Sequence, residues 1–250
     1  MANKRGPKRK SRARRMLALF EHAWVMSRSA LNETQLDIEY DRAGDGSKRS
    51  VGEIRSVFRF ARVRGKPFPE DVLSRLEADP VMSGLALHVG SVFWELLENP
   101  PVTRDQARSM VNKSLVRLIS ARAVAGAGEG KTNHCASSIS SAGCDLASSL
   151  EWAGGTVDAL IAMYPVSLDL IALLGALSRE AWFCFQADEA AFFGTKFWIL
   201  LQDFLSQPGM ERLEGVLDEY AVDRIVYWRD DPRCGSSWLP DGDETLPDSY

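Results

Sequence analysis

The chain has 250 residues, of which 45% are apolar and 26% are charged. This is the composition of a soluble globular protein with one large domain or two small ones. It excludes a chain that is disordered throughout, a collagen-like protein and a small disulfide-stabilised protein. The net charge of -4 conceals an asymmetry, because residues 1–124 carry +9 and residues 125–250 carry -13. Such a division suggests that the first half meets a polyanion, or alternatively that the two halves attract each other.

The N-terminus is strongly basic, with eight lysines or arginines and no acid in the first fifteen residues. Because almost none of these residues is apolar, the sequence predicts a disordered basic arm over residues 1–15. A first helix is expected from Arg14 to Leu31, where apolar residues recur at helical spacing. The alternation over residues 35–40 is too short to predict a strand, and residues 41–46 are expected to form a loop.

Capping and stop signals place the next helices. A capping box from Ser50 to Glu53 predicts a helix that runs to Arg64, where Gly65 ends it. A short helix is expected over residues 69–76, because proline is well tolerated in the first turn. Residues 81–98 are predicted to form one longer, largely buried helix.

A second capping box, from Thr103 to Gln106, predicts the start of another helix. Its apolar residues form one stripe along the helix. The members of this stripe are Met110, Val111, Leu115, Leu118 and Ile119.

The second half begins with a change of composition, since 15 of residues 125–150 are Gly, Ala or Ser. After it, residues 156–205 are rich in large apolar side chains, with breaks expected at Pro165 and Gly175. A final helix is predicted over residues 210–227. The expected protein is therefore mostly α, with a disordered basic arm (1–15), a basic helical domain (16–124), a Gly/Ala/Ser-rich linker (125–150), an acidic, aromatic-rich helical domain (151–228) and an acidic tail (229–250).

The arm is the clearest functional signal, because each neutralised phosphate of a nucleic acid releases condensed counterions. The helix that ends at Arg64 adds Arg55, Arg59 and Arg62 at i, i+4 and i+7, which predicts a cationic face. A plain amphipathic surface helix would show the same pattern. The predicted nucleic-acid-binding residues are Lys4, Arg5, Lys8, Arg9, Lys10, Arg12, Arg14, Arg15, Arg55, Arg59, Arg62, Arg64 and Lys66. Arg104, Arg108, Lys113 and Arg117 extend the basic character with the same ambiguity.

Residues 125–132, AGAGEGKT, match a P-loop pattern when Ala is allowed in the first position. In a working P-loop Lys131 would reach the phosphates and Thr132 would bind Mg²⁺. However, a P-loop follows a buried strand, and residues 115–124 continue a helical stripe instead. A nucleotide hydrolase is therefore only the alternative function.

Other patterns favour structural roles. The candidate zinc ligands His134, Cys135, Cys144 and Cys234 match no zinc module in their spacing. The four scattered cysteines indicate an intracellular protein with reduced thiols. Residues 159–178 are apolar enough to be tested as a membrane span, but Pro165 and Asp169 favour a buried helix pair. The stripe Trp182, Phe185, Phe193, Phe197 and Phe204 is expected in the core or a subunit interface, because acidic neighbours would repel phosphate.

The leading hypothesis is a non-enzymatic nucleic-acid-binding protein, such as a regulator, a mobile-element accessory protein or a viral nucleocapsid or coat-type protein. It would bind through the arm and the cationic helices and self-associate through its C-terminal helical part. No catalytic residue, cofactor or metal is assigned, and no membrane contact is expected. The alternatives are the P-loop hydrolase and a helical scaffold whose arm is a nuclear localisation signal. The expected location is the cytoplasm or nucleoid of a bacterium, or the nucleus for a eukaryotic or viral protein.

Overall fold

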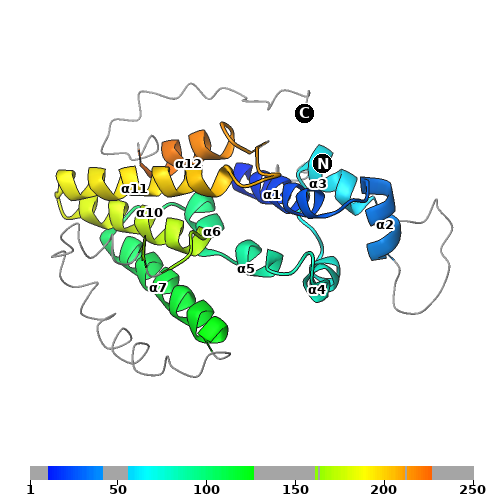
Figure 1. Cartoon of the computed structure of the whole chain (residues 1–250). Helices are drawn as coiled ribbons and strands as arrows, with labels where there is room; N and C mark the ends of the chain where they lie inside the picture. The colour runs from blue at the N-terminus through cyan, green and yellow to red at the C-terminus, as the bar shows by residue number, and fades with distance from the viewer. Residues whose placement is uncertain (1–10, 42–55, 127–160, 163, 212, 227–250) are drawn as a thin grey trace, which may run out of the picture. The chain divides into compact units, whose positions relative to one another are not determined.

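The computed structural model describes residues 11–41, 56–126, 161–162, 164–211 and 213–226 (Figure 1). Helices account for 74% of these residues and no strand occurs among them, which confirms the mostly α fold. The chain divides into two compact units. Of the described residues, unit 1 contains 11–41, 56–89, 208–211 and 213, and unit 2 contains 90–126, 161–162, 164–207 and 214–226.

Unit 1 is built from short helices. They are α1 (Arg12–Arg28), α2 (Glu33–Asp41), α3 (Val57–Arg64), α4 (Glu70–Ala78) and α5 (Leu85–Val89). Helix α1 contacts α3 and α5, while α2 contacts α3 and α4. Aromatic side chains fill the space between them: Phe20 and Trp24 lie with ring centroids 5.9 Å apart, and Phe58 and Phe68 with centroids 4.8 Å apart.

Helix α1 begins earlier than the sequence suggests, at Arg12, so the last residues of the predicted disordered arm are helical. Ser11 is the N-cap, and its hydroxyl accepts a hydrogen bond from the Arg14 backbone N–H at 3.3 Å. Ala13 and Met16 are buried. Burial of these two side chains stabilises the first turn of α1, which the charged residues of the arm would not hold in a helix by themselves. Residues 1–10 lie outside the described part of the chain.

Two further elements of unit 1 differ from their predictions. Residues 35–40, where no strand could be assigned, belong to helix α2, whose start is capped because Gln35 N donates to Asn32 Oδ1 at 3.0 Å. The single helix expected over residues 81–98 is instead two helices. Gly84 has a φ of 90°, and Ser91 caps a new helix by accepting from Phe93 N at 3.2 Å. Both features interrupt the helical hydrogen-bond ladder.

A segment from much later in the chain completes unit 1. Met210 and Leu213 are buried, and Gly209 has a φ of 88° beside Ser27. A Cβ at position 209 would overlap the Cβ of Ser27, so only glycine fits there. The helix predicted over residues 210–227 is consequently shorter and is α12 (Leu217–Ile225).

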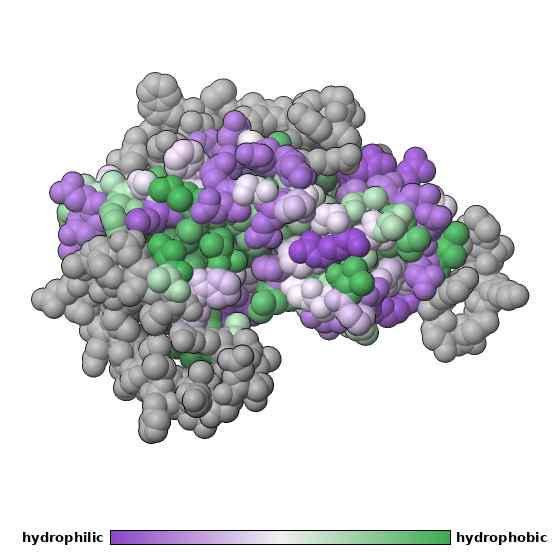
Figure 2. Space-filling view, viewed as in Figure 1, coloured by the Kyte–Doolittle hydropathy of each residue, from purple (hydrophilic) through white to green (hydrophobic). Residues whose placement is uncertain are grey.

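The described part of unit 2 includes α12 and four other helical elements. These are α6 (Val92–Glu98), α7 (Arg104–Gly126), α10 (Leu168–Phe183) and α11 (Ala187–Leu205). Helix α10 contacts all of the others, and its most extensive contacts are with α7 and α11. Figure 2 shows a group of hydrophobic side chains on the visible face of this unit.

Gly175 lies inside α10 and does not break it, which corrects the prediction. A Cβ at this position would lie 3.0 Å from both Leu96 Cδ2 and Ile225 Cγ2, and 3.1 Å from Phe197 Cδ2. The missing side chain of Gly175 therefore allows α6, α11 and α12 to pack closely against α10, although glycine in the middle of a helix lowers the stability of that helix. The segment 164–167 around Pro165 is not helical, as expected.

The predicted aromatic stripe is only partly in the core. Phe193, Phe197 and Phe204 are buried, whereas Phe185 is 90% exposed. Phe185 has a φ of 62° at the end of α10, and the N–H of Gln186 donates to Ala181 O in the pattern of a Schellman motif.

Residues 115–124, which would have to form the strand before a P-loop, belong to helix α7. The pattern itself lies outside the described residues from residue 127 onward, as do the rest of the predicted linker, the candidate zinc ligands and the acidic tail. Among the helices that the structure describes, none has the length and apolar character needed to cross a membrane.

Glu21 is fully buried in α1 and accepts a hydrogen bond from the Phe68 backbone N–H at 2.6 Å. Its other oxygen, Oε1, has no hydrogen-bond partner within the described residues. Burial raises the pKa of this carboxyl to about 8, despite the opposing effect of the Phe68 N–H. The carboxyl is therefore protonated in the folded state at neutral pH.

Because the folded state holds this proton and the unfolded state releases it near pH 4.5, the free energy of unfolding should fall as the pH rises from about 4.5 to about 8. The fall can reach about 4 kcal/mol. The substitution Glu21→Gln should flatten this dependence, as measured by chemical denaturation of the full chain across the same pH range. An equally steep dependence in the variant would assign the effect to other groups.

Candidate nucleic-acid interface

The start of α1 and the end of α3 meet at one place and bring together cations that are far apart in sequence. We call the set Arg12, Arg14, Arg15, Arg64 and Lys66 the basic cluster. Gly65, with a φ of 53°, is the left-handed cap of α3. A Cβ there would lie 2.7 Å from Arg15 Cγ, so the backbone that carries Arg64 and Lys66 lies directly against Arg15.

Most members of the basic cluster point to solvent. Arg12, Arg14, Arg64 and Lys66 are exposed, and Arg15 is half-buried. Among the described residues, no salt bridge includes Arg15, Arg59, Arg64 or Lys66. Their positive charge is therefore available to an anion from outside the unit.

The carboxylates of unit 1 are largely engaged within the unit. Glu21, Asp37, Glu77 and Asp79 accept hydrogen bonds from backbone N–H groups, and Glu33 and Asp71 pair with arginines. These carboxylates stabilise turns and helix ends. Within the described residues, none of them forms a salt bridge with Arg15, Arg64 or Lys66.

The predicted cationic face of α3 is divided by its contacts. Arg62 forms a two-point ion pair with Glu33, with Nε to Oε1 at 2.6 Å and Nη2 to Oε2 at 3.1 Å. Glu33 Oε1 also lies 2.7 Å from His22 Nε2. The hydrogen bond from Arg62 lowers the pKa of the Glu33 carboxyl. Arg62 thus holds α3 against α2, whereas Arg59 is exposed and Arg55 lies outside the described residues.

The His22–Glu33 pair lines a cavity of 650 Å³ in unit 1. Ser27, Asn32 and Glu211 also line this cavity. Its charged lining is acidic or already paired, so it offers no attraction to phosphate. The cavity and the basic cluster are therefore different kinds of surface.

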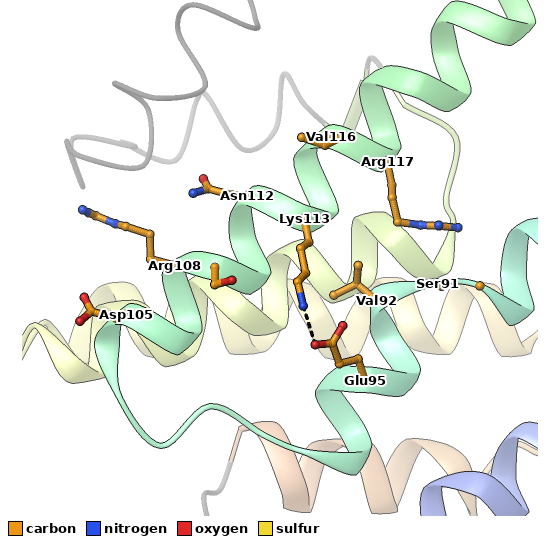
Figure 3. Close-up of a pocket in the computed structure, with 11 residues that line it drawn as sticks. Ser91, Val92, Glu95, Asp105, Arg108, Asn112, Lys113, Val116 and Arg117 are labelled. Atoms are coloured by element: carbon orange, nitrogen blue, oxygen red, sulfur yellow. Dashed lines mark hydrogen bonds and ion pairs between the residues drawn. The ribbon is translucent and has the colours of Figure 1, made fainter.

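The cations of α7 are held by carboxylates of unit 2. Arg108 Nε lies 2.9 Å from Glu180 Oε1, Arg117 Nε lies 3.0 Å from Asp169 Oδ2, and Lys113 Nζ lies 2.6 Å from Glu95 Oε1. Arg104 is more distant, at 3.9 Å from Glu180. Arg108, Lys113 and Arg117 line an open groove of 760 Å³ along α6 and α7 (Figure 3).

Asp169 and Glu180, the carboxylates that bind Arg117 and Arg108, are nearly inaccessible to water. Asp169 also accepts from Ser91 Oγ at 2.7 Å and from Val92 N at 3.1 Å, so it joins α6, α7 and α10. Burial raises the pKa of Glu180, although Arg108 opposes this effect. Removing such partners would leave buried carboxylates unpaired. Arg108 and Arg117 accordingly stabilise unit 2, while Lys113 pairs with the exposed Glu95. None of the three belongs to the candidate interface.

Of the predicted site residues, the structure brings together Arg12, Arg14, Arg15, Arg64 and Lys66. Lys4, Arg5, Lys8, Arg9, Lys10 and Arg55 lie outside the described residues. Phe60 was not among the predicted site residues. It is half-buried beside the basic cluster, and the Arg64 guanidinium carbon lies 4.3 Å from its ring centroid. The signal was the i, i+4 spacing of Phe60 and Arg64.

The different environments of two arginines on α3 give a direct test. Arg62→Ala should destabilise unit 1 by about 1 kcal/mol, because Glu33 loses its two-point partner. Arg59→Ala should change the free energy of unfolding by less than about 0.5 kcal/mol. Chemical denaturation of both variants measures the difference. Equal losses of stability would contradict these assignments.

Comparison with known proteins finds no family model that matches the chain, no curated protein similar in sequence and no solved structure similar in fold. The function is therefore argued from the charges, contacts and exposure of the described residues.

Proposed function

We propose that this chain is a non-enzymatic protein that binds nucleic acid through its basic cluster and the cations that precede it. The observation that carries the proposal is the contact of Gly65 with Arg15, which joins two basic segments into one surface. The cations Lys4, Arg5, Lys8, Arg9 and Lys10 come directly before this surface in the sequence. A series of cations of this kind supplies affinity for phosphate through the release of counterions.

The two alternative functions receive less support. A P-loop hydrolase would need a strand before residue 125, and α7 occupies that part of the chain up to Gly126. A scaffold with a localisation signal would need only residues 7–12 of the arm. It would leave the joined cations of α1 and α3 without a role.

The first experiment measures the affinity of the full chain for a labelled oligonucleotide by fluorescence anisotropy at several salt concentrations. Affinity should fall steeply with salt. Deletion of residues 1–10 should flatten the log–log slope by several units, since it removes five cations. The deletion stops at residue 10 because Ser11 caps α1.

A pair of point variants separates the cluster from general charge. Arg64→Gln with Lys66→Gln should reduce the slope by up to about two, one for each lost phosphate contact. Lys113→Gln is the matched control and should leave the slope unchanged, because Lys113 pairs with Glu95. Salt-independent binding, or equal effects of the cluster and control variants, would refute the proposal.

We also propose that two copies of the chain associate through the exposed face of α11. Ala191, Thr195, Trp198 and Ile199 share this face, and the last two are 48% and 43% exposed. No charged residue interrupts it between Ala191 and Gln202 except Lys196, whose ammonium lies 5.6 Å from the Phe192 ring centroid. The Thr195 hydroxyl donates to Ala191 O at 2.9 Å and needs no outside partner. A face with one lysine and otherwise uncharged residues is compatible with a second copy of itself, because few like charges would oppose each other.

Trp198→Glu should shift the protein from dimer to monomer, because it places two like charges in the proposed contact. Sedimentation velocity at several concentrations measures the change. Val102→Glu is the control, since Val102 is 60% exposed but lies before α7. A monomeric wild-type chain, or dissociation by the control as well, would contradict this contact.

A further inference from the structure

The outward surface of α3 mixes cations with apolar side chains. Arg59, Phe60, Val63 and Arg64 occupy positions i, i+1, i+4 and i+5, which form a single patch on a helix. We call them the α3 quartet. On the opposite side of the helix, Phe58 and Ala61 are buried in unit 1. The quartet therefore faces away from the core.

The apolar members of the quartet are accessible. Val63 is 55% exposed, and Phe60 is half-buried. The Arg64 guanidinium carbon lies 4.3 Å from the centroid of the Phe60 ring, so the ring supports the planar cation. Both an aromatic ring and a guanidinium plane are surfaces on which an unpaired base stacks.

We propose that the α3 quartet binds single-stranded nucleic acid, with a base stacked on the Phe60–Arg64 pair and phosphates held by Arg59 and Lys66. This inference rests on the proposed function and specifies its ligand. In a duplex the base faces are already stacked on one another, and the protein meets phosphates and base edges. An exposed Val63 and an accessible ring would gain little there. A single strand offers phosphates and apolar base faces together, which matches the composition of the quartet.

The quartet is also continuous with the basic cluster, because they share Arg64 and because Gly65 lies against Arg15. A strand that stacks a base on Arg64 would pass the cations of α1 within the same unit. Stacking supplies affinity that does not depend on salt, whereas the cluster supplies affinity that does. The two contributions can therefore be measured separately.

The test uses the full chain, a labelled oligothymidine and a mixed-sequence duplex of the same length, with anisotropy measured across a salt series. The single strand should bind at least about tenfold more tightly than the duplex. Phe60→Leu and Arg64→Lys should each weaken single-strand binding about tenfold, which corresponds to one lost stacking contact. Both variants keep the charge, so the salt slope and duplex binding should not change. Phe60→Tyr keeps the ring and should bind as the wild type does.

The outcomes distinguish this inference from the proposed function. Equal binding of duplex and single strand, with Phe60→Leu unchanged, would overturn the inference and leave the proposed function standing. Binding of neither nucleic acid would overturn both. A stronger affinity for vesicles of anionic lipid, lost in Phe60→Leu, would assign the quartet to a membrane surface and overturn the inference. Thermal unfolding of each variant shows whether a lost affinity reflects a lost fold.

Discussion

The internal use of carboxylates decides which cations of this chain remain accessible. In unit 2 the buried Asp169 and Glu180 bind Arg117 and Arg108, and in unit 1 Glu33 binds Arg62. Leaving Asp169 or Glu180 buried without its partner would strongly destabilise unit 2, so Arg117 and Arg108 are required by the fold. Glu33 is partly exposed, and Arg62 stabilises unit 1 less strongly. Arg15, Arg64 and Lys66 form no salt bridge within the described residues, and they lie where α3 ends against α1. The proposed binding surface thus consists of cations that the fold does not use in ion pairs of its own.

This constraint also explains the opposite charges of the two halves of the sequence. Helix α7 comes from the basic half and packs on α10 from the acidic half, with ion pairs near both ends of their contact. Part of the charge asymmetry therefore reflects attraction within unit 2, which is the alternative that the sequence left open. Much of the rest lies at the two ends of the sequence, since residues 1–10 carry +5 and residues 227–250 carry -4.

Some local signals in the sequence predicted local structure and others did not. The capping box at Ser50 did not place the start of α3, which begins at Val57 after the N-cap Ser56. Gly65 ends α3 in the left-handed conformation, as expected. At the start of α7, the Gln106 backbone N–H donates to Thr103 Oγ1 at 3.3 Å, and Gln106 Oε1 accepts from Val102 N at 2.9 Å. The contacts of the candidate site were not predictable in the same way. Arg62 and Glu33 are 29 residues apart, and periodicity tells which face of a helix a residue occupies but not what that face meets. Gly175 shows the same limit, since its lack of a side chain serves three neighbours from distant parts of the sequence.

Residues 208–213 have a consequence for the order in which the protein is made. They lie between α11 and α12, both helices of unit 2, yet they supply Met210 and Leu213 to the core of unit 1. During synthesis, the first unit to leave the ribosome therefore stays incomplete until most of the second has emerged. The core of unit 1 is completed only after residues 208–213 have been synthesised and Gly209 packs against Ser27. The nascent N-terminal helices must keep apolar surface exposed over that interval, which is the period in which a partner or chaperone could hold them.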